Sequence, residues 1–216
     1  MLKAIAFDLD GVLTDTAEYH YLAWKELGKK IGIDFDREFN EKLKGISRGE
    51  SLELILALGD QQKAYTPEEK TEMMVWKNDL YIELIQNITK KDILPGILPL
   101  LEALKENNIK MAIASASKNA PMILEKLGII SYFDTIVDPS SIANGKPFPD
   151  IFIAASEQLN IPVSQMIGIE DSQAGITSIN DSQMFSVGVG VLEQADYLVP
   201  STAELNFDSI IAQFNN

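Results

Sequence analysis

The stretch "KAIAFDLDGVLTDT", residues 3–16, decides the fold, because a short apolar run stops there at two aspartates. We predict a buried strand over residues 3–7. Side chains alternate between the two faces of a strand, so Asp8 and Asp10 would project to the same side. Two carboxylates held about 4 Å apart repel by roughly 4 kcal/mol at an effective dielectric constant of about 20. A bound cation or a shared proton would relieve this repulsion.

The composition is that of a soluble globular protein of one domain with an inserted or appended second one, because 46% of the 216 residues are hydrophobic and 23% are charged. The net charge of −14 argues against a nucleic-acid or membrane partner but allows a small anionic substrate. The chain has no cysteine, which suits a reducing cytosol, and we expect a cytoplasmic location. We expect neither a signal peptide nor a transmembrane helix.

Short apolar runs rich in β-branched or small residues alternate with helical patterns along most of the chain. The predicted strands are residues 3–7, 110–115, 134–137, 166–170, 184–189 and 196–199. The predicted helices between them are residues 97–107, 120–127, 149–159 and 173–182. Most of the strands lack polar alternation, which predicts a parallel sheet covered on both faces. The fold class is therefore α/β, with a doubly wound, Rossmann-like core.

Residues 16–92 interrupt this alternation with helical patterns alone. Two apolar stripes are expected to pack inward, His20–Trp24–Leu27–Ile31 in the first helix and Met73–Trp76–Leu80–Leu84 in the last. We predict a helical cap domain over residues 16–92, inserted after the first strand of a core formed by residues 1–15 and 93–216. The expected tethers are residues 12–15 and 90–95. Such an insert is expected to act as a lid over the carboxyl ends of the strands.

Charged and hydroxyl side chains follow the ends of the predicted strands, where a parallel sheet gathers its ligands. They are Asp8, Asp10, Ser115, Lys146, Glu170 and Asp171. Oxygen ligands without a histidine or cysteine cluster favour a hard cation, most consistently Mg²⁺. Mg²⁺ and Lys146 would offset three of the four carboxylate charges, and a proton on Asp10 would offset the fourth. We therefore assign Asp10 as general acid/base and Asp8 as the nucleophile.

The segments "FDLDGVLTDT" and "GIEDS", with Ser115 and Lys146 between them, resemble the four motifs of the haloacid dehalogenase-like superfamily over the whole chain. The helical insert is similar to the type-1 cap of that family. The resemblance implies Mg²⁺-dependent phosphoryl transfer through an aspartyl phosphate on Asp8. It further implies a metal site of Asp8, the Asp10 carbonyl, Glu170 and Asp171. Ser115 and Lys146 would hold the transferring phosphoryl group.

Four further segments are similar to a sugar-phosphate mutase of this superfamily, namely "TDTAEYHYLAWKELGKKIGI", "LKGISRGESL", "ASASKNAP" and "KPFPDIFIAA". This implies interconversion of β-D-glucose 1-phosphate and glucose 6-phosphate, with glucose 1,6-bisphosphate as primer and bound intermediate. Arg48 would clamp the phosphate that is not transferred. The other residues implied at the substrate or the distal phosphate are Thr16, His20, Trp24, Lys44, Gly45, Ser117, Lys118 and Asn119.

Two other functions fit parts of the same pattern. A sugar-phosphate phosphatase would share the core residues but would leave water access to the phosphorylated aspartate. A non-catalytic, metal-dependent binding module would keep the fold without turnover. Local structural roles are also open, since Thr16 and Asn119 stand where helix N-caps are expected and Trp24 suits a cap core. We expect a monomer.

Overall fold

The computed structural model describes residues 1–215 and contains a parallel sheet of six strands in the order β3-β2-β1-β4-β5-β6. The strands are β1 (Ala4–Phe7), β2 (Lys110–Ile113), β3 (Thr135–Ile136), β4 (Met166–Glu170), β5 (Phe185–Val189) and β6 (Tyr197–Val199). Strand β1 lies in the middle, with Ala4 level with Lys110 of β2 and with Met166 of β4. All six predicted strands are confirmed, each with nearly its predicted bounds.

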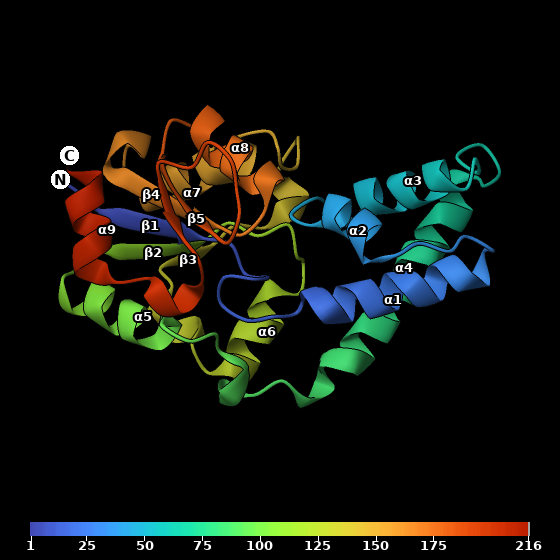
Figure 1. The fold of residues 1–216 in the computed structure, drawn as a ribbon, viewed down its shortest axis with the longest axis horizontal. Coiled ribbons are helices and arrows are strands. Elements are labelled where there is room, and N and C mark those ends of the chain that lie inside the picture. The colour runs from blue at the N-terminus through green and yellow to red at the C-terminus, as the bar shows by residue number, and fades with distance from the viewer. Residues whose placement is uncertain (216) are drawn as a thin grey trace. The chain divides into compact units, whose positions relative to one another are not determined.

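Helices cover both faces of this sheet (Figure 1). α5 (Ile97–Glu106), α6 (Ala120–Leu127) and α9 (Phe207–Phe214) lie on one face, and α7 (Asp150–Leu159) and α8 (Gln173–Asp181) lie on the other. This is the doubly wound α/β fold that the sequence predicts. Helix α9 is not among the predicted elements, although Phe207, Ile210, Ile211 and Phe214 recur at helical spacing after the N-cap Asn206.

The core packs small residues of the sheet against large residues of the helices. Ala4 and Ala6 of β1 and Ala112 of β2 are fully buried in one cluster with Phe152 of α7. The alanines leave room for helices to approach the sheet closely, which large side chains on the same face would prevent. The middle strand is therefore rigidly held immediately before Asp8.

The chain divides into two compact units, one formed by residues 1–15 and 88 onward and the other by Thr16–Asn87. These units meet at residues 15/16 and 87/88, and the cap domain of residues 16–92 stays a prediction. The second unit contains α1 (Ala17–Lys30), α2 (Arg37–Asn40), α3 (Arg48–Leu58) and α4 (Pro67–Leu84). Capping boxes begin α3 at Ser47 and α4 at Thr66.

The inward face of α4 differs from the predicted stripe. Its fully buried residues are Lys77 and Tyr81, whereas Leu80 and Leu84 are only half-buried. Met73 and Trp76 do pack against the apolar cluster of this unit. We predicted an inward face of apolar residues only, but the aliphatic stem of Lys77 and the ring of Tyr81 lie at its centre instead. The stripe on α1 is confirmed for Trp24 and Leu27, which are buried in that cluster.

The predicted tethers pair with each other at the edge of the first unit. Thr14 and Ile93 form an antiparallel bridge, and Leu94 N donates to Leu13 O at 3.0 Å. The buried Thr14 hydroxyl donates to Asp92 O at 2.8 Å. The chain thus enters and leaves the insert through one hydrogen-bonded pair of segments.

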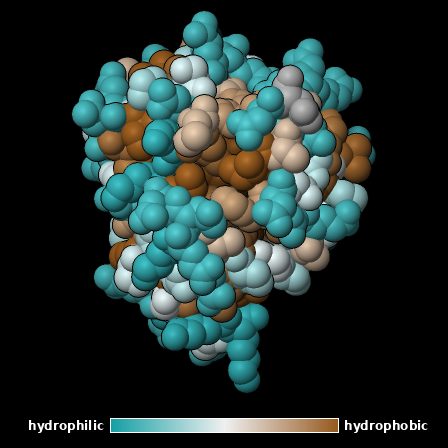
Figure 2. All heavy atoms as spheres, turned by 90° about the vertical axis from the view of Figure 1, so that its left-hand side faces the viewer, coloured by the Kyte–Doolittle hydropathy of each residue, from teal (hydrophilic) through white to brown (hydrophobic). Residues whose placement is uncertain are grey.

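A hollow of about 680 Å³ lies at the amino-terminal end of β5, where Met1, Met184, Phe185 and Phe214 line it together with polar residues such as Asn180 and Asp196. Figure 2 shows apolar residues gathered around a hollow on the face that carries the chain ends. The charged residues predicted for the site follow the opposite, carboxyl ends of the strands. None of the helices within residues 1–215 combines the length and apolarity needed to cross a membrane.

We predict that Phe152→Ala lowers the free energy of unfolding by about 3–5 kcal/mol, because it removes a fully buried ring from the core. The neighbouring substitution Ile153→Ala is the control, since Ile153 is 37% exposed on the same helix, and should cost less than about 1 kcal/mol. Urea denaturation followed by circular dichroism measures both. Equal losses in the two variants would contradict the packing described here.

Candidate active site

A buried lysine lies between two buried carboxylates at the carboxyl ends of the strands. Lys146 Nζ is 2.6 Å from Asp8 Oδ1 and 2.5 Å from Glu170 Oε1. Asp8 directly follows β1, Glu170 is the last residue of β4, and these strands are neighbours. Lys146 comes from the loop before α7, which Pro147 and Pro149 keep out of the helix. The predicted convergence of these three residues is confirmed.

The start of α8 holds the Glu170 carboxylate in place. Glu170 Oε2 accepts hydrogen bonds from Asp171 N, Ser172 N and Ser172 Oγ, each at 2.9 Å. Ser172 is also the N-cap of α8, since its hydroxyl accepts from Gly175 N at 3.0 Å. The short segment "EDS" therefore both caps a helix and fixes the orientation of a buried charge.

Two glycines leave room for the acidic side chains. A Cβ added at Gly175 would lie 1.9 Å from Glu170 Cδ, and one added at Gly11 would lie 2.0 Å from Asp171 Oδ2. Gly11 also has φ +80°, a conformation that other residues rarely adopt. Gly11 is thus required for two reasons. A larger residue would collide with Asp171, and the turn needs a positive φ angle at this position.

The electrostatics of the site depend on burial and on the central lysine. Burial raises the pKa of Asp8 to about 6, from an ordinary 3.8, with Lys146 opposing the rise and Glu170 adding to it. Burial alone would lower the pKa of Lys146, but Asp8 and Glu170 raise it above its usual value. Glu170 is the carboxylate that raises the pKa of Asp8. The sequence spacing of Asp8 and Asp10 does not reveal this pairing.

Asp8, Glu170 and Asp171 form a group whose ligand atoms lie within 4.8 Å of one another, the geometry of a possible metal site. The Asp10 side chain is outside this group. Its predicted contribution, a backbone carbonyl ligand, stays a prediction. The group fits a cation because it gathers three carboxylates, and Lys146 pairs with two of them, Asp8 and Glu170.

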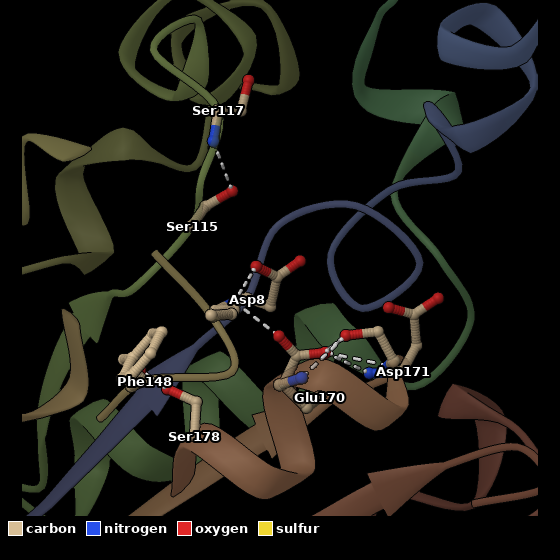
Figure 3. Close-up of polar contacts among 10 residues, drawn as sticks. Asp8, Ser115, Ser117, Phe148, Glu170, Asp171 and Ser178 are labelled. Atoms are coloured by element: carbon tan, nitrogen blue, oxygen red, sulfur yellow. Dashed lines mark hydrogen bonds and ion pairs between the residues drawn. The ribbon is translucent and has the colours of Figure 1, made fainter. Parts of the chain in front are cut away.

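Ser115 and Ser117 follow β2, on the opposite side of Asp8 from Glu170 (Figure 3). Ser115 Oγ accepts from Ser117 N at 3.2 Å, and Ser117 Oγ accepts from Asn119 N at 3.3 Å. This turn leads into α6, where Asn119 is in the N-cap position without a side-chain capping bond. Lys118 is exposed on the same turn.

The predicted substrate residues in the cap have different surroundings. Arg48 is the first residue of α3, and its Nη2 donates to Asn78 Oδ1 of α4 at 2.7 Å. Burial lowers the pKa of Arg48, which is about half-buried. Lys44 forms an ion pair with Glu41 at 2.9 Å, and Gly45 follows it with φ +72°.

His20 and Trp24 belong to a packed group inside the cap. Lys77 Nζ lies 2.7 Å from His20 Nδ1 and 4.7 Å from the Trp24 ring centroid. The His20 ring stacks on Tyr81 with centroids 4.0 Å apart. Thr16 is buried at the N-cap position of α1 and makes no side-chain capping bond. The substrate roles of all these cap residues stay predictions.

The sequence analysis missed the residues that support the site. In the core these are Ser172, Gly175 and Ser178, and in the cap they are Lys77, Asn78 and Tyr81. A spacing of three residues in "SQAGITS" was the available signal for the first set. The signal for the second set was the spacing of four residues between Lys77 and Tyr81, which places them on one face of the predicted helix.

Several known proteins are similar to this chain in sequence and in structure. A family model described as haloacid dehalogenase-like hydrolase matches residues 2–182. β-Phosphoglucomutase of Bacillus subtilis is 51% identical over 96% of this chain and 93% of its own length. The crystal structure of β-phosphoglucomutase (pgmB) from Clostridium difficile matches with a TM-score of 0.98 at 50% identity, covering 100% of this chain and 98% of that one. A phosphorylated carbohydrates phosphatase of Thermotoga maritima is 27% identical over 81% of this chain and 79% of its own length.

We predict that Asp8→Asn stabilises the metal-free protein by about 1–3 kcal/mol at a pH well above 6. Because the pKa of Asp8 is raised, the charged form of Asp8 destabilises the folded protein. This loss of stability develops as the pH rises from about 4 to about 6, and it persists at higher pH. The advantage of the variant should therefore shrink as the pH falls through this window. Urea denaturation in chelator-treated buffer at a series of pH values measures it. A variant less stable than the parent at neutral pH would contradict this account.

Proposed function

Because the chain belongs to the haloacid dehalogenase-like hydrolase family, we propose that it is a phosphomutase that interconverts β-D-glucose 1-phosphate and glucose 6-phosphate. The observation that carries this proposal is its likeness, over nearly the whole chain, to two proteins named β-phosphoglucomutase. The buried group of Asp8, Lys146 and Glu170 supports it, since phosphoryl transfer needs a fixed nucleophile and a positive charge beside it.

In the proposed cycle, the Asp8 carboxylate attacks phosphorus and becomes an aspartyl phosphate as the bond to the leaving oxygen breaks. Phospho-Asp8 then passes its phosphoryl group to a sugar hydroxyl, whose proton moves to Asp10. The resulting glucose 1,6-bisphosphate reorients and returns its other phosphate to Asp8, while Asp10 gives the proton to the leaving oxygen. Lys146 offsets charge on the phosphoryl oxygens, and Ser115 donates a hydrogen bond to them.

Mg²⁺ is the cation that we propose for the acidic cluster, because its ligands are carboxylate oxygens. When bound, Mg²⁺ would offset negative charge on the transferring group. Asp8 and Asp171 would hold it together with Glu170 and the Asp10 carbonyl. Glu170 Oε2 already accepts from three donors, whereas Oε1 accepts from Lys146, so Oε1 is the oxygen better placed to serve as a ligand.

A sugar-phosphate phosphatase is the rival within the same family, and it would use the same core residues. What distinguishes a mutase is a second locus for the distal phosphate, for which we propose Arg48, Ser117, Lys118 and Asn119. Lys44, Gly45, Thr16, His20 and Trp24 remain predicted substrate contacts. The cytoplasmic location and the monomeric state also stay predictions.

The test of the function is a product assay with Mg²⁺, β-D-glucose 1-phosphate and a trace of glucose 1,6-bisphosphate. Glucose 6-phosphate and free phosphate are followed together, with Asp8→Asn as the blank and a chelator-treated sample as the metal control. We expect glucose 6-phosphate in large excess over free phosphate, and loss of both products in the two controls. Free phosphate as the main product would favour the phosphatase, and neither product would favour the binding module.

We predict that Arg48→Ala lowers mutase turnover by about tenfold or more, because one charge-assisted phosphate contact is lost. Hydrolysis of a generic phosphoester, which has no distal phosphate, should change little. Arg37→Ala is the matched control, since Arg37 is an exposed cap arginine paired with Glu18. Similar losses in the mutase and hydrolysis assays would remove Arg48 from the distal locus.

A further inference from the structure

Helix α8 and its N-cap contact Glu170 and the loop that carries Lys146. Ser172, Gly175 and Ser178 follow one another at a spacing of three residues. Ser172 binds the Glu170 carboxylate, and Gly175 leaves the space that this carboxylate occupies. Ser178 lies a turn further on and points toward the loop that carries Lys146 (Figure 3).

Ser178 contacts that loop through a side-chain hydrogen bond to its backbone. Its hydroxyl, which has no exposed surface, donates to Phe148 O at 2.6 Å. The Phe148 ring is 54% exposed, so packing of that side chain does little to anchor the residue. Phe148 N donates to Gly145 O at 3.0 Å and closes a turn around Lys146.

The other end of the loop is fixed from a different helix. Asn144 donates from both its backbone N and its Nδ2 to Asp150 Oδ1, at 3.2 and 3.1 Å. Asp150 is the first residue of α7. Lys146 therefore lies between two anchors, one at the exposed Asn144 and one at the Phe148 carbonyl, whose donor Ser178 is fully buried.

We propose that Ser178 is a positioning residue for phosphoryl transfer, acting through the Phe148 carbonyl on the placement of Lys146. The inference rests on the proposed function, in which Lys146 acts on the transferring phosphoryl group. One rigid helix fixes Glu170 through Ser172 and fixes the Lys146 loop through Ser178. The same helix therefore holds both the Lys146 loop and the Glu170 carboxylate. This keeps the distance between Lys146 and Glu170 constant while ligands bind and leave.

The position of Lys146 matters because the rate of phosphoryl transfer is sensitive to the distances between the catalytic groups. Lys146 makes contacts of 2.6 and 2.5 Å with its two partners. A displacement of about 1 Å in a catalytic group can cost about a hundredfold in rate. Without the Ser178 bond, the Phe148 carbonyl would lose its buried donor, and the backbone around Lys146 would rely more on the exposed Asn144 anchor.

The test compares Ser178→Ala with Ser182→Ala in the full-length protein. Ser182 is a matched control, because it is also buried and its hydroxyl donates to Ile179 O at 2.6 Å, but it does not contact the Lys146 loop. We measure kcat and KM of the mutase reaction, hydrolysis of acetyl phosphate as a simple probe of Asp8 phosphorylation, and hydrogen exchange at the Phe148 amide.

We expect Ser178→Ala to lower kcat and acetyl phosphate hydrolysis by about tenfold, with little change in KM, and to speed exchange at Phe148. Ser182→Ala should leave all three near the parent values, whatever stability it loses. Unchanged kcat in Ser178→Ala, or an equal loss in Ser182→Ala, would overturn the proposal. If the parent protein made no glucose 6-phosphate, the proposed function would fail, while acetyl phosphate hydrolysis and exchange would still decide the role of Ser178.

Discussion

The arrangement of the core depends on one buried ammonium group, Lys146 Nζ, held between the carboxylates of Asp8 and Glu170. Burying charges is costly, and a buried pair is tolerated only where geometry and further hydrogen bonds compensate. Here Glu170 has three additional donors at the start of α8. Without Lys146, the buried carboxylates of Asp8 and Glu170 would face each other with no positive charge between them. The loop that carries Lys146, the ends of β1 and β4 and the start of α8 must therefore be positioned together.

The parallel sheet makes this convergence possible. Strands β1 and β4 are adjacent, so the residues that follow Phe7 and complete β4 meet at one edge although 162 positions separate Asp8 from Glu170. The small residues of β1 let the flanking helices pack closely, which keeps α8 and the loop before α7 near that edge. The same packing that stabilises the core therefore sets the distances within the site.

The sequence predicted the elements of the core better than their mutual contacts. Unbroken apolar runs and turn residues are local signals, and they identified the six strands and the four helices that connect them. The sequence also pointed to Asp8, Lys146 and Glu170, because Asp8 and Glu170 stand at the ends of such runs and Lys146 stands in a proline-rich loop. It did not reveal that Lys146 bridges the other two, or that Ser178 reaches Phe148, because these contacts join segments whose distance depends on the whole fold. The inward face of α4 was misjudged for a related reason, since hydropathy cannot show that the aliphatic stem of Lys77 is buried.

The environment of His20 illustrates how such contacts decide a chemical role. An ammonium group can only donate hydrogen bonds, so Lys77 Nζ must donate to His20 Nδ1, which places the ring proton on Nε2. Burial, Lys77 and Arg48 together hold the pKa of His20 well below its ordinary value. A second proton on this ring would face two cations, so the neutral form persists at physiological pH. His20 is therefore suited to donate a hydrogen bond from Nε2 and not to carry protons, which leaves Asp10 as the proton-transfer residue of the proposed cycle.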